Sequence, residues 1–185
     1  MAPNQPPWPR RWLMTDERLG ESLWQAIEAL PQGGGIVFRH YSLADAQRAA
    51  LGREIAGVAR ARSLVLTIAR SRNFADELGA ALVHNPEGPG PLPCSMAVHD
   101  EAQAAAAWTA GAALVFVGPV HPTRSHPGAP ALGLVKAAEL AALAGCPAIA
   151  QGGMDERRYE ELESVFPGAF HGYAGIDCWT VAART

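Results

Sequence analysis

The residues best suited to chemistry lie in one proline-rich segment, VGPVHPTRSHPGAPALG, which spans residues 117–133. Thr123 and Ser125 offer hydroxyl donors, while Arg124 and His126 can supply positive charge to an oxyanion or a phosphate. The prolines restrict the backbone, so less conformational freedom is lost when these groups bind a ligand. The segment therefore predicts a preorganised anion-binding loop.

A second candidate for phosphate binding is Gln151–Gly152–Gly153, which lies between an apolar run and a helical segment. Glycines let backbone N–H groups approach a phosphate closely, and the dipole of a helix N-terminus favours an anion. A pair of glycines is also compatible with a simple tight turn, so both interpretations stay open here.

None of the histidines falls on a predicted helix face. Each of three ends a predicted strand (His40, His84 and His99), two lie in the proline-rich segment (His121 and His126), and His171 lies in the last strand. If the strands are parallel, these side chains converge on a polar pocket at the carboxyl ends of the strands. A zinc or iron site built from His84, His99 and His121 is an alternative. Carboxylates that could complete it are few, so we predict a pocket without metal ligands.

These residues must be positioned by a regular alternation of strands and helices. Apolar runs rich in β-branched residues predict strands over residues 12–16, 35–40, 63–69, 80–84, 95–100, 112–118, 147–153 and 169–176. Helical patterns lie between them, with start signals at Ser42 and Asp45, at Asp100 and Gln103, and at Asp155. Residues 85–93, NPEGPGPLP, contain too much proline for a helix.

Strand–helix units in this order predict a (β/α)8 TIM barrel of the α/β class. It is a trimmed barrel, with the fourth helix replaced by a loop and a short last helix. The chain of 185 residues has room for one domain, which we place over residues 1–185. A doubly wound open sheet is the competing fold, but no GxGxxG motif follows the first strand.

The composition argues against several classes of partner. The chain is 49% hydrophobic and 18% charged, with a formal net charge of −3, so it has no general attraction for nucleic acid or an anionic membrane. No apolar run reaches the roughly 18 residues of a membrane helix, and no apolar region follows Arg10–Arg11 as in an export signal. We therefore expect a cytoplasmic protein. Its five tryptophans indicate core or interface surface, which leaves a homodimer open.

The segments GPVHPTRSHPGAPALG and CPAIAQGGM resemble thiamine phosphate synthases and the related thiazole tautomerases. In that family a GPxxPTxTK loop is followed by a strand that carries two glycines. WLMTD, GGGIVFRH, GAALVH and SMAVHD resemble other segments of the family in the same order, so the likeness runs from about Trp12 to Gly175.

The resemblance implies the condensation of hydroxymethylpyrimidine pyrophosphate with thiazole phosphate. It also implies Mg²⁺ on two aspartates, with lysines beside the pyrophosphate. Here the first aspartate position falls near Arg70, and Glu87 is the only acid near the second. Tyr41 and His126 stand where the family has lysines. We therefore predict that the usual Mg²⁺ ligands and catalytic lysines are missing.

Carried over position by position, the resemblance and the residue types together predict a site at the barrel mouth. The predicted catalytic residues are Arg39, His99, His121 and His126. The predicted phosphate- or substrate-binding residues are Thr123, Arg124, Ser125, Gln151, Gly152, Gly153, Arg70 and His84. The partner that this site implies is a small phosphorylated heterocycle.

Three functions remain open at this stage. The leading one is a transferase, a divergent synthase in which Arg39, Arg70 and Arg124 hold pyrophosphate directly. The second is a tautomerase-like enzyme that moves a proton on a phosphorylated heterocycle with a histidine. The third is a non-catalytic binder of a phosphorylated thiamine precursor.

Overall fold

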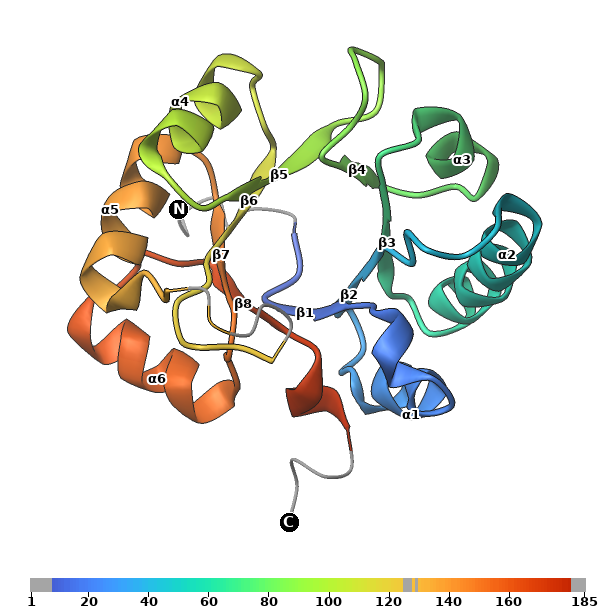
Figure 1. The fold of residues 1–185 in the computed structure, drawn as a ribbon, viewed down its shortest axis with the longest axis horizontal. Coiled ribbons are helices and arrows are strands. Elements are labelled where there is room, and N and C mark those ends of the chain that lie inside the picture. Colours follow the sequence, from blue (N-terminus) through green and yellow to red (C-terminus); the bar gives the residue numbers. More distant parts are fainter. Residues whose placement is uncertain (1–7, 125–127, 129, 181–185) are drawn as a thin grey trace, which may run out of the picture.

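The computed structural model describes residues 8–124, 128 and 130–180. Within them, parallel strands pair in chain order and β8 pairs with β1, which closes a barrel (Figure 1). The strands are β1 Arg11–Met14, β2 Gly35–Phe38, β3 Val65–Ala69, β4 Leu82–His84, β5 Cys94–Val98, β6 Leu114–Val117, β7 Ala148–Gln151 and β8 Gly172–Gly175. The predicted TIM barrel is confirmed, and the open sheet is excluded.

Helices cover the outside of this barrel (Figure 1). They are η1 Glu17–Leu19, α1 Ser22–Ala29, α2 Asp45–Ala61, α3 Arg72–Glu77, α4 Glu101–Thr109, α5 Gly133–Ala144, α6 Glu156–Val165 and η2 Asp177–Trp179. Residues 85–93, all of which are described, form a loop between β4 and β5, and a single short 3-10 helix, η2, follows β8 up to residue 180. Both departures from a full barrel agree with the prediction.

Two of the predicted helix caps are present, and one is wrong. The Asp100 side chain accepts a hydrogen bond from the Gln103 N–H at 2.8 Å, and Asp155 accepts one from the Arg158 N–H at 2.8 Å. Ser42 does not cap α2. Its N–H and hydroxyl instead donate to Glu17 Oε1 at 2.9 and 3.0 Å, which ties the loop after β2 to η1.

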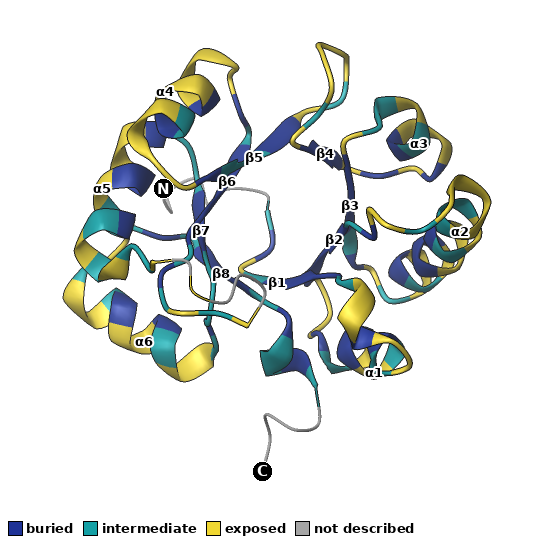
Figure 2. Ribbon diagram, in the orientation of Figure 1, coloured by how far each residue is buried: buried dark blue, intermediate teal, exposed yellow. Residues whose placement is uncertain are grey.

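Most residues of the strands are buried, whereas the helices expose their outer faces (Figure 2). Inside the barrel, the Trp12 ring of β1 meets the Phe116 ring of β6 edge-on at 5.4 Å between centroids. A Cβ on Gly35, which pairs with Trp12, would lie 2.2 Å from the indole, so a glycine here makes room for the large ring. Aromatic packing thus fills the barrel below its mouth.

His171 lies at the opposite end of the barrel from the expected pocket, and the prediction for this histidine is wrong. Strand β8 begins at Gly172, later than the apolar pattern indicates, so His171 precedes the strand. Its N–H donates to the carbonyl oxygen of Ala148, the first residue of β7, at 2.7 Å. Its Nε2 donates to the Trp8 carbonyl oxygen at 2.7 Å. His171 therefore closes the amino-terminal end of the barrel.

The tryptophans on which the predicted homodimer rests differ in their exposure. Trp12 and Trp179 are buried, whereas the Trp108 side chain on α4 is 65% exposed. The homodimer stays a prediction. Among the described residues, none of the helices has the length and apolar character that crossing a membrane requires.

Candidate functional site

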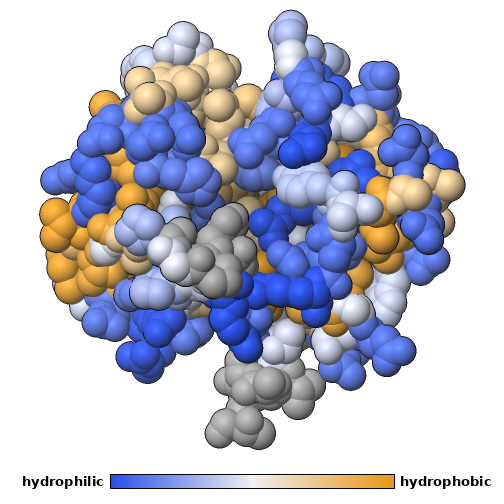
Figure 3. Space-filling model, viewed as in Figure 1, coloured by the Kyte–Doolittle hydropathy of each residue, from blue (hydrophilic) through white to orange (hydrophobic). Residues whose placement is uncertain are grey.

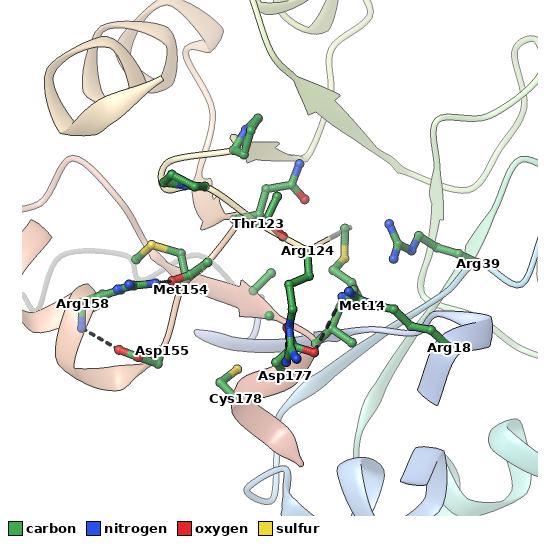
Figure 4. Close-up of a pocket in the computed structure, with 18 of the residues that line it drawn as sticks. Met14, Arg18, Arg39, Thr123, Arg124, Met154, Asp155, Arg158, Asp177 and Cys178 are labelled. Carbon is green, nitrogen blue, oxygen red and sulfur yellow. Dashed lines mark hydrogen bonds and ion pairs between the residues drawn. The ribbon is translucent and has the colours of Figure 1, made fainter. Parts of the chain in front are cut away.

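A pocket of about 380 Å³ opens at the mouth of the barrel, where β1, β7 and β8 end (Figure 4). Its walls come from the loop between β6 and α5, the turn after β7, the segment after β8, and residues near the ends of β1 and β2. On the face seen in Figure 3, the most hydrophilic side chains gather around this mouth. The pocket lies at the carboxyl ends of the strands, as the barrel fold leads one to expect.

The pocket brings together seven of the residues that the sequence predicted for the site: Arg39, His99, Thr123, Arg124, Gln151, Gly152 and Gly153. Ser125 and His126 lie outside the described residues. His84, His121 and Arg70 do not line the pocket. The catalytic and binding roles of all of them stay predictions.

The loop after β6 is anchored on the turn after β7. The Val120 N–H donates to the Gln151 carbonyl oxygen at 2.8 Å, and the His121 N–H donates to the Gly152 carbonyl oxygen at 3.1 Å. Gly152 and Gly153 have φ values of +87° and +62°, in the left-handed region that favours glycine. A Cβ on Gly152 would lie 2.5 Å from the Pro119 Cα, so the close contact of the two segments also requires glycine.

Helix α6 starts directly behind this turn and brings positive charge to it. Its first turn is capped by Asp155, and the Arg158 guanidinium donates to the Gly153 carbonyl oxygen. The N-terminal end of a helix carries a partial positive charge from its unpaired N–H groups. Together with Arg158, it favours an anion at the turn.

Charged side chains form an alternating chain across the mouth. Arg39 pairs with Asp16 at 3.0 Å, and the other oxygen of Asp16 lies 3.4 Å from Arg18. Arg18 lies 3.7 Å from Asp177, which in turn contacts Arg124 at 3.1 Å. Figure 4 shows Arg18 and Arg124 reaching Asp177 from two directions. The chain links the ends of β1, β2 and β8 to the loop after β6.

His99 is oriented by the backbone of that same loop. Its Nδ1 forms a hydrogen bond with the Gly118 carbonyl oxygen. Because a carbonyl oxygen only accepts, Nδ1 must carry the proton. In the neutral ring, Nε2 is then the nitrogen that can take up a proton. His99 is therefore the histidine of the pocket whose tautomer is fixed by a neighbour.

His84 lies inside the barrel below the pocket. It is 3% exposed, its Nδ1 lies 3.1 Å from the Ser95 hydroxyl oxygen, and its ring meets Phe116 edge-on. Desolvation by burial lowers the pKa of His84 to about 3, so the imidazole is neutral near neutral pH. This environment suits a core residue, because a protonated ring would be buried without a counter-ion.

His121 and Arg70 are likewise absent from the lining of the pocket. The His121 Nε2 is buried and has no hydrogen-bond partner among the described residues, and burial, followed by the nearby Arg158, lowers the pKa of the ring. Arg70 stacks its guanidinium 4.3 Å from the centre of the exposed Tyr41 ring. Its backbone has a φ of +68°, in the left-handed region, directly after the end of β3.

The carboxylates of the pocket do not suit Mg²⁺. Asp155 caps α6, and Asp177 is paired with two arginines, while Glu87 is exposed on the loop after β4. At sites for phosphate substrates, Mg²⁺ is usually held by one or two carboxylates together with substrate phosphates and water. The two acids of this pocket are already engaged as a helix cap and as a partner of arginines. In the described part of the chain, no three His, Cys, Asp or Glu side chains are placed to hold a metal ion. The alternative site of His84, His99 and His121 is likewise not assembled.

Several lining residues were not among the predicted site residues: Met14, Arg18, Met154, Arg158, Asp177 and Cys178. Arg18 and Arg158 belong to the first turns of the helical segments after β1 and β7. A basic residue in the first turn after a strand is the signal that could have found them. The Cys178 thiol stays protonated near neutral pH, because burial raises its pKa to about 12.

The fold and the pocket define a parallel (β/α)8 barrel with an arginine-lined pocket at its carboxyl-terminal mouth. The model of the thiamine monophosphate synthase family matches residues 12–176, and the chain belongs to this family. The family membership that the loop and the double glycine predicted is thereby confirmed. A search of curated proteins finds no match to the chain.

Solved structures of similar fold include two that carry the family's activity in their names. Thiamine phosphate pyrophosphorylase from Pyrococcus furiosus is 20% identical with a TM-score of 0.75, over 94% of this chain and 87% of that one. Thiamine phosphate pyrophosphorylase from Bacteroides thetaiotaomicron is 14% identical with a TM-score of 0.59, over 92% and 83%. At such identities the likeness shows the fold alone.

Proposed function

We propose that this protein binds thiazole phosphate in the mouth pocket and condenses it with hydroxymethylpyrimidine pyrophosphate. The observation that carries this proposal is the gathering of Arg18, Arg39, Arg124 and Arg158 around one pocket beside the Gly152–Gly153 turn. Such a set offers guanidinium donors on two sides of one pocket, as the binding of both a phosphate and a pyrophosphate would require. It fits a transferase of the family to which the chain belongs.

The thiazole phosphate would bind at the turn after β7. There the glycine backbone, the N-terminus of α6 and Arg158 together favour a phosphate dianion. Arg39, Arg18 and Arg124 lie on the other side of the pocket, where they would bind the pyrophosphate. Guanidinium groups bind phosphate oxygens through two parallel hydrogen bonds, which positions the leaving group.

The reaction breaks the bond between the methylene carbon of the pyrimidine and the pyrophosphate oxygen. The electron pair of that bond leaves with pyrophosphate, and the thiazole ring nitrogen then forms a bond to the carbon. The arginines would stabilise the negative charge that develops on the leaving oxygen. Because the acids of the pocket do not fit Mg²⁺, the arginines are proposed to take over this task.

His99 favours a second candidate function, the transfer of a proton on a phosphorylated thiazole. Its Nδ1 is held by the Gly118 carbonyl oxygen, which leaves Nε2 to act as a general base. This candidate needs one phosphate site and no pyrophosphate chemistry.

The test is a condensation assay with the full-length protein, in which thiamine phosphate is quantified by mass spectrometry. Thiazole phosphate and hydroxymethylpyrimidine pyrophosphate are supplied with Mg²⁺ or with EDTA. If arginines hold the pyrophosphate, thiamine phosphate is expected to form in EDTA. Formation of thiamine phosphate only in the samples with Mg²⁺ would contradict the arginine proposal. No product in either condition would sink the synthase.

The same protein then separates the remaining functions. Deuterium uptake from heavy water into the thiazole phosphate precursor would support the proton-transfer enzyme, and His99→Gln should abolish it. Binding of thiazole phosphate with neither product nor exchange would leave a non-catalytic binder. Arg53→Gln is the surface control and should leave condensation, exchange and binding unchanged. Arg53 pairs with Glu77 outside the pocket, and its side chain is 60% exposed.

A further inference from the structure

We propose that Asp177 is a resident counter-ion that competes with the ligand for Arg18 and Arg124. By holding both arginines, its carboxylate would set a threshold that favours phosphate and diphosphate groups over singly charged anions such as carboxylates. This inference rests on the proposed function in one respect, namely that the ligand of the pocket is a phosphate ester.

The geometry of Asp177 matches what a phosphate oxygen would do in this pocket. Its Oδ2 lies 3.2 Å from Nε and 3.1 Å from Nη2 of Arg124, so one carboxylate oxygen contacts two nitrogens of the guanidinium. Its Oδ1 faces Arg18 at 3.7 Å. The carboxylate thus occupies the positions between two arginines that an anionic ligand would need.

This bridge is exposed enough to be exchanged. The side chains of Asp177 and Arg124 are 42% and 77% exposed, and that of Arg18 is 31% exposed. Ion pairs in such contact with water contribute little stability, because the charges are screened and the side chains lose freedom. A ligand with two negative charges can therefore displace the carboxylate at small cost.

Asp177 has fewer local contacts that support the fold than the other acid of the ionic chain, Asp16, has. Asp177 is the first residue of η2, whose N-cap is the apolar Ile176, and its carboxylate contacts Arg18 and Arg124. The neighbouring acid Asp16 differs, because it caps η1 by accepting from the Arg18 N–H and also holds Arg39. Of the two acids in the ionic chain, Asp177 is therefore the one whose carboxylate a ligand can displace from the arginines.

The bridge also separates two cavities. A second hollow of about 450 Å³ adjoins the bridge, and its other lining residues are Leu19, Ser22, Gln25 and Thr180. Arg18, Arg124 and Asp177 line both this hollow and the mouth pocket. An anion that enters from either side meets the same two arginines, and release of Asp177 joins the cavities into one larger site.

Isothermal titration of the full-length protein with inorganic pyrophosphate, and separately with acetate, tests the inference. Asp177→Asn keeps the shape of the side chain and removes its charge, so pyrophosphate affinity should rise about tenfold, with acetate binding gained as well. Adding Arg124→Gln to this variant should cancel the gain. Glu54→Gln removes one exposed acid of α2 outside the pocket and should leave both affinities unchanged.

Unchanged or weaker pyrophosphate binding in Asp177→Asn would overturn the inference, as would an equal gain in Glu54→Gln or no binding in any variant. Asp177→Ser serves the same purpose if the asparagine variant does not fold. Tighter pyrophosphate binding by a protein that never forms thiamine phosphate would support this inference and sink the proposed synthase. Formation of thiamine phosphate, with the same pyrophosphate affinity in Asp177→Asn as in the native protein, would support the proposed synthase and overturn this inference.

Discussion

The N–H of His121 donates a hydrogen bond to the Gly152 carbonyl oxygen, so the loop after β6 rests on the turn after β7. Gly153 extends the same contact, because a Cβ there would lie 2.9 Å from the Pro122 carbonyl oxygen. The two segments that form this side of the pocket are therefore joined by backbone hydrogen bonds and close contacts. Their close approach depends on residues without a side chain.

Gly153→Ala should damage both stability and phosphate binding. The residue has a φ of +62°, which costs an alanine about 1–2 kcal/mol, and the methyl group would also clash with the loop. Gly33→Ala is the matched control, because Gly33 has a φ of +74° with nothing within 4 Å of its Cβ position. Urea unfolding and titration with inorganic phosphate measure both effects. If both variants lose the same stability and Gly153→Ala keeps its phosphate affinity, the contact between Gly153 and the loop after β6 does not have the role given to it here.

His84 should make the protein less stable in acid. Burial lowers its pKa from 6.5 to about 3 in the folded protein, so between these values the unfolded chain binds a proton that the folded chain does not. Stability is therefore complete above pH 6.5 and falls with decreasing pH, by about 1.4 kcal/mol per pH unit at most.

Urea unfolding at several pH values between 7 and 4 checks this, with His84→Gln as the comparison. The glutamine can still reach the Ser95 hydroxyl but does not titrate, so the stability gap to the native protein should shrink as the pH falls. A gap that stays constant would show that His84 is not the group responsible. His40 and His121, whose pKa values burial also lowers, contribute equally to both proteins.

Arg39→Gln should weaken pyrophosphate binding about tenfold, because the variant loses a charged donor at the pocket wall. The Arg39 Nε already donates to the Thr15 carbonyl oxygen at 2.8 Å, which holds the guanidinium near the mouth. Calorimetric titration measures the effect, and a lower slope of affinity against salt concentration should accompany it. Arg53→Gln removes the same charge from the surface, and a similar loss there would point to net charge alone.

The barrel could be predicted because a buried parallel strand leaves a strong signal in the sequence. LVFV in β6 and GIVF in β2 are continuous apolar runs, as strands covered on both faces must be. The loop in place of the fourth helix was equally predictable, since proline excludes helix from residues 85–93. Strand ends were less certain, and a late start of β8 moved His171 to the other end of the barrel.

The sequence predicted which strand ends and loops form the candidate site, but it did not predict which side chains of those segments face the pocket. His84 and His99 both follow apolar runs, yet His84 is the last residue of its strand and points into the core, while His99 lies beyond its strand and lines the pocket. A shift of one residue along a strand reverses the side to which a side chain points. Arg18 and Arg158 were missed because helices place them at the mouth.

A pair of glycines in α2 offers the sharpest test of the packing around the barrel. Gly57 is exposed and has nothing within 4 Å of its Cβ position, so Gly57→Ala should stabilise the protein by about 0.5–1 kcal/mol through the better helix propensity of alanine. Gly52 lies in the same helix but is buried, and a Cβ there would come within 2.6 Å of the Phe74 ring of α3.

Gly52→Ala gains the same propensity but must push α2 and α3 apart, for which overpacking of a core costs about 1–3 kcal/mol. The two variants should therefore change the free energy of unfolding in opposite directions, as measured by urea unfolding at pH 7. Because both substitutions add one methyl group to one helix, the difference between them isolates the contact with Phe74. Stabilisation by both variants would mean that α3 can retreat from α2, and that the Arg48 guanidinium, 5.2 Å from the Phe74 ring centre, does not hold it in place.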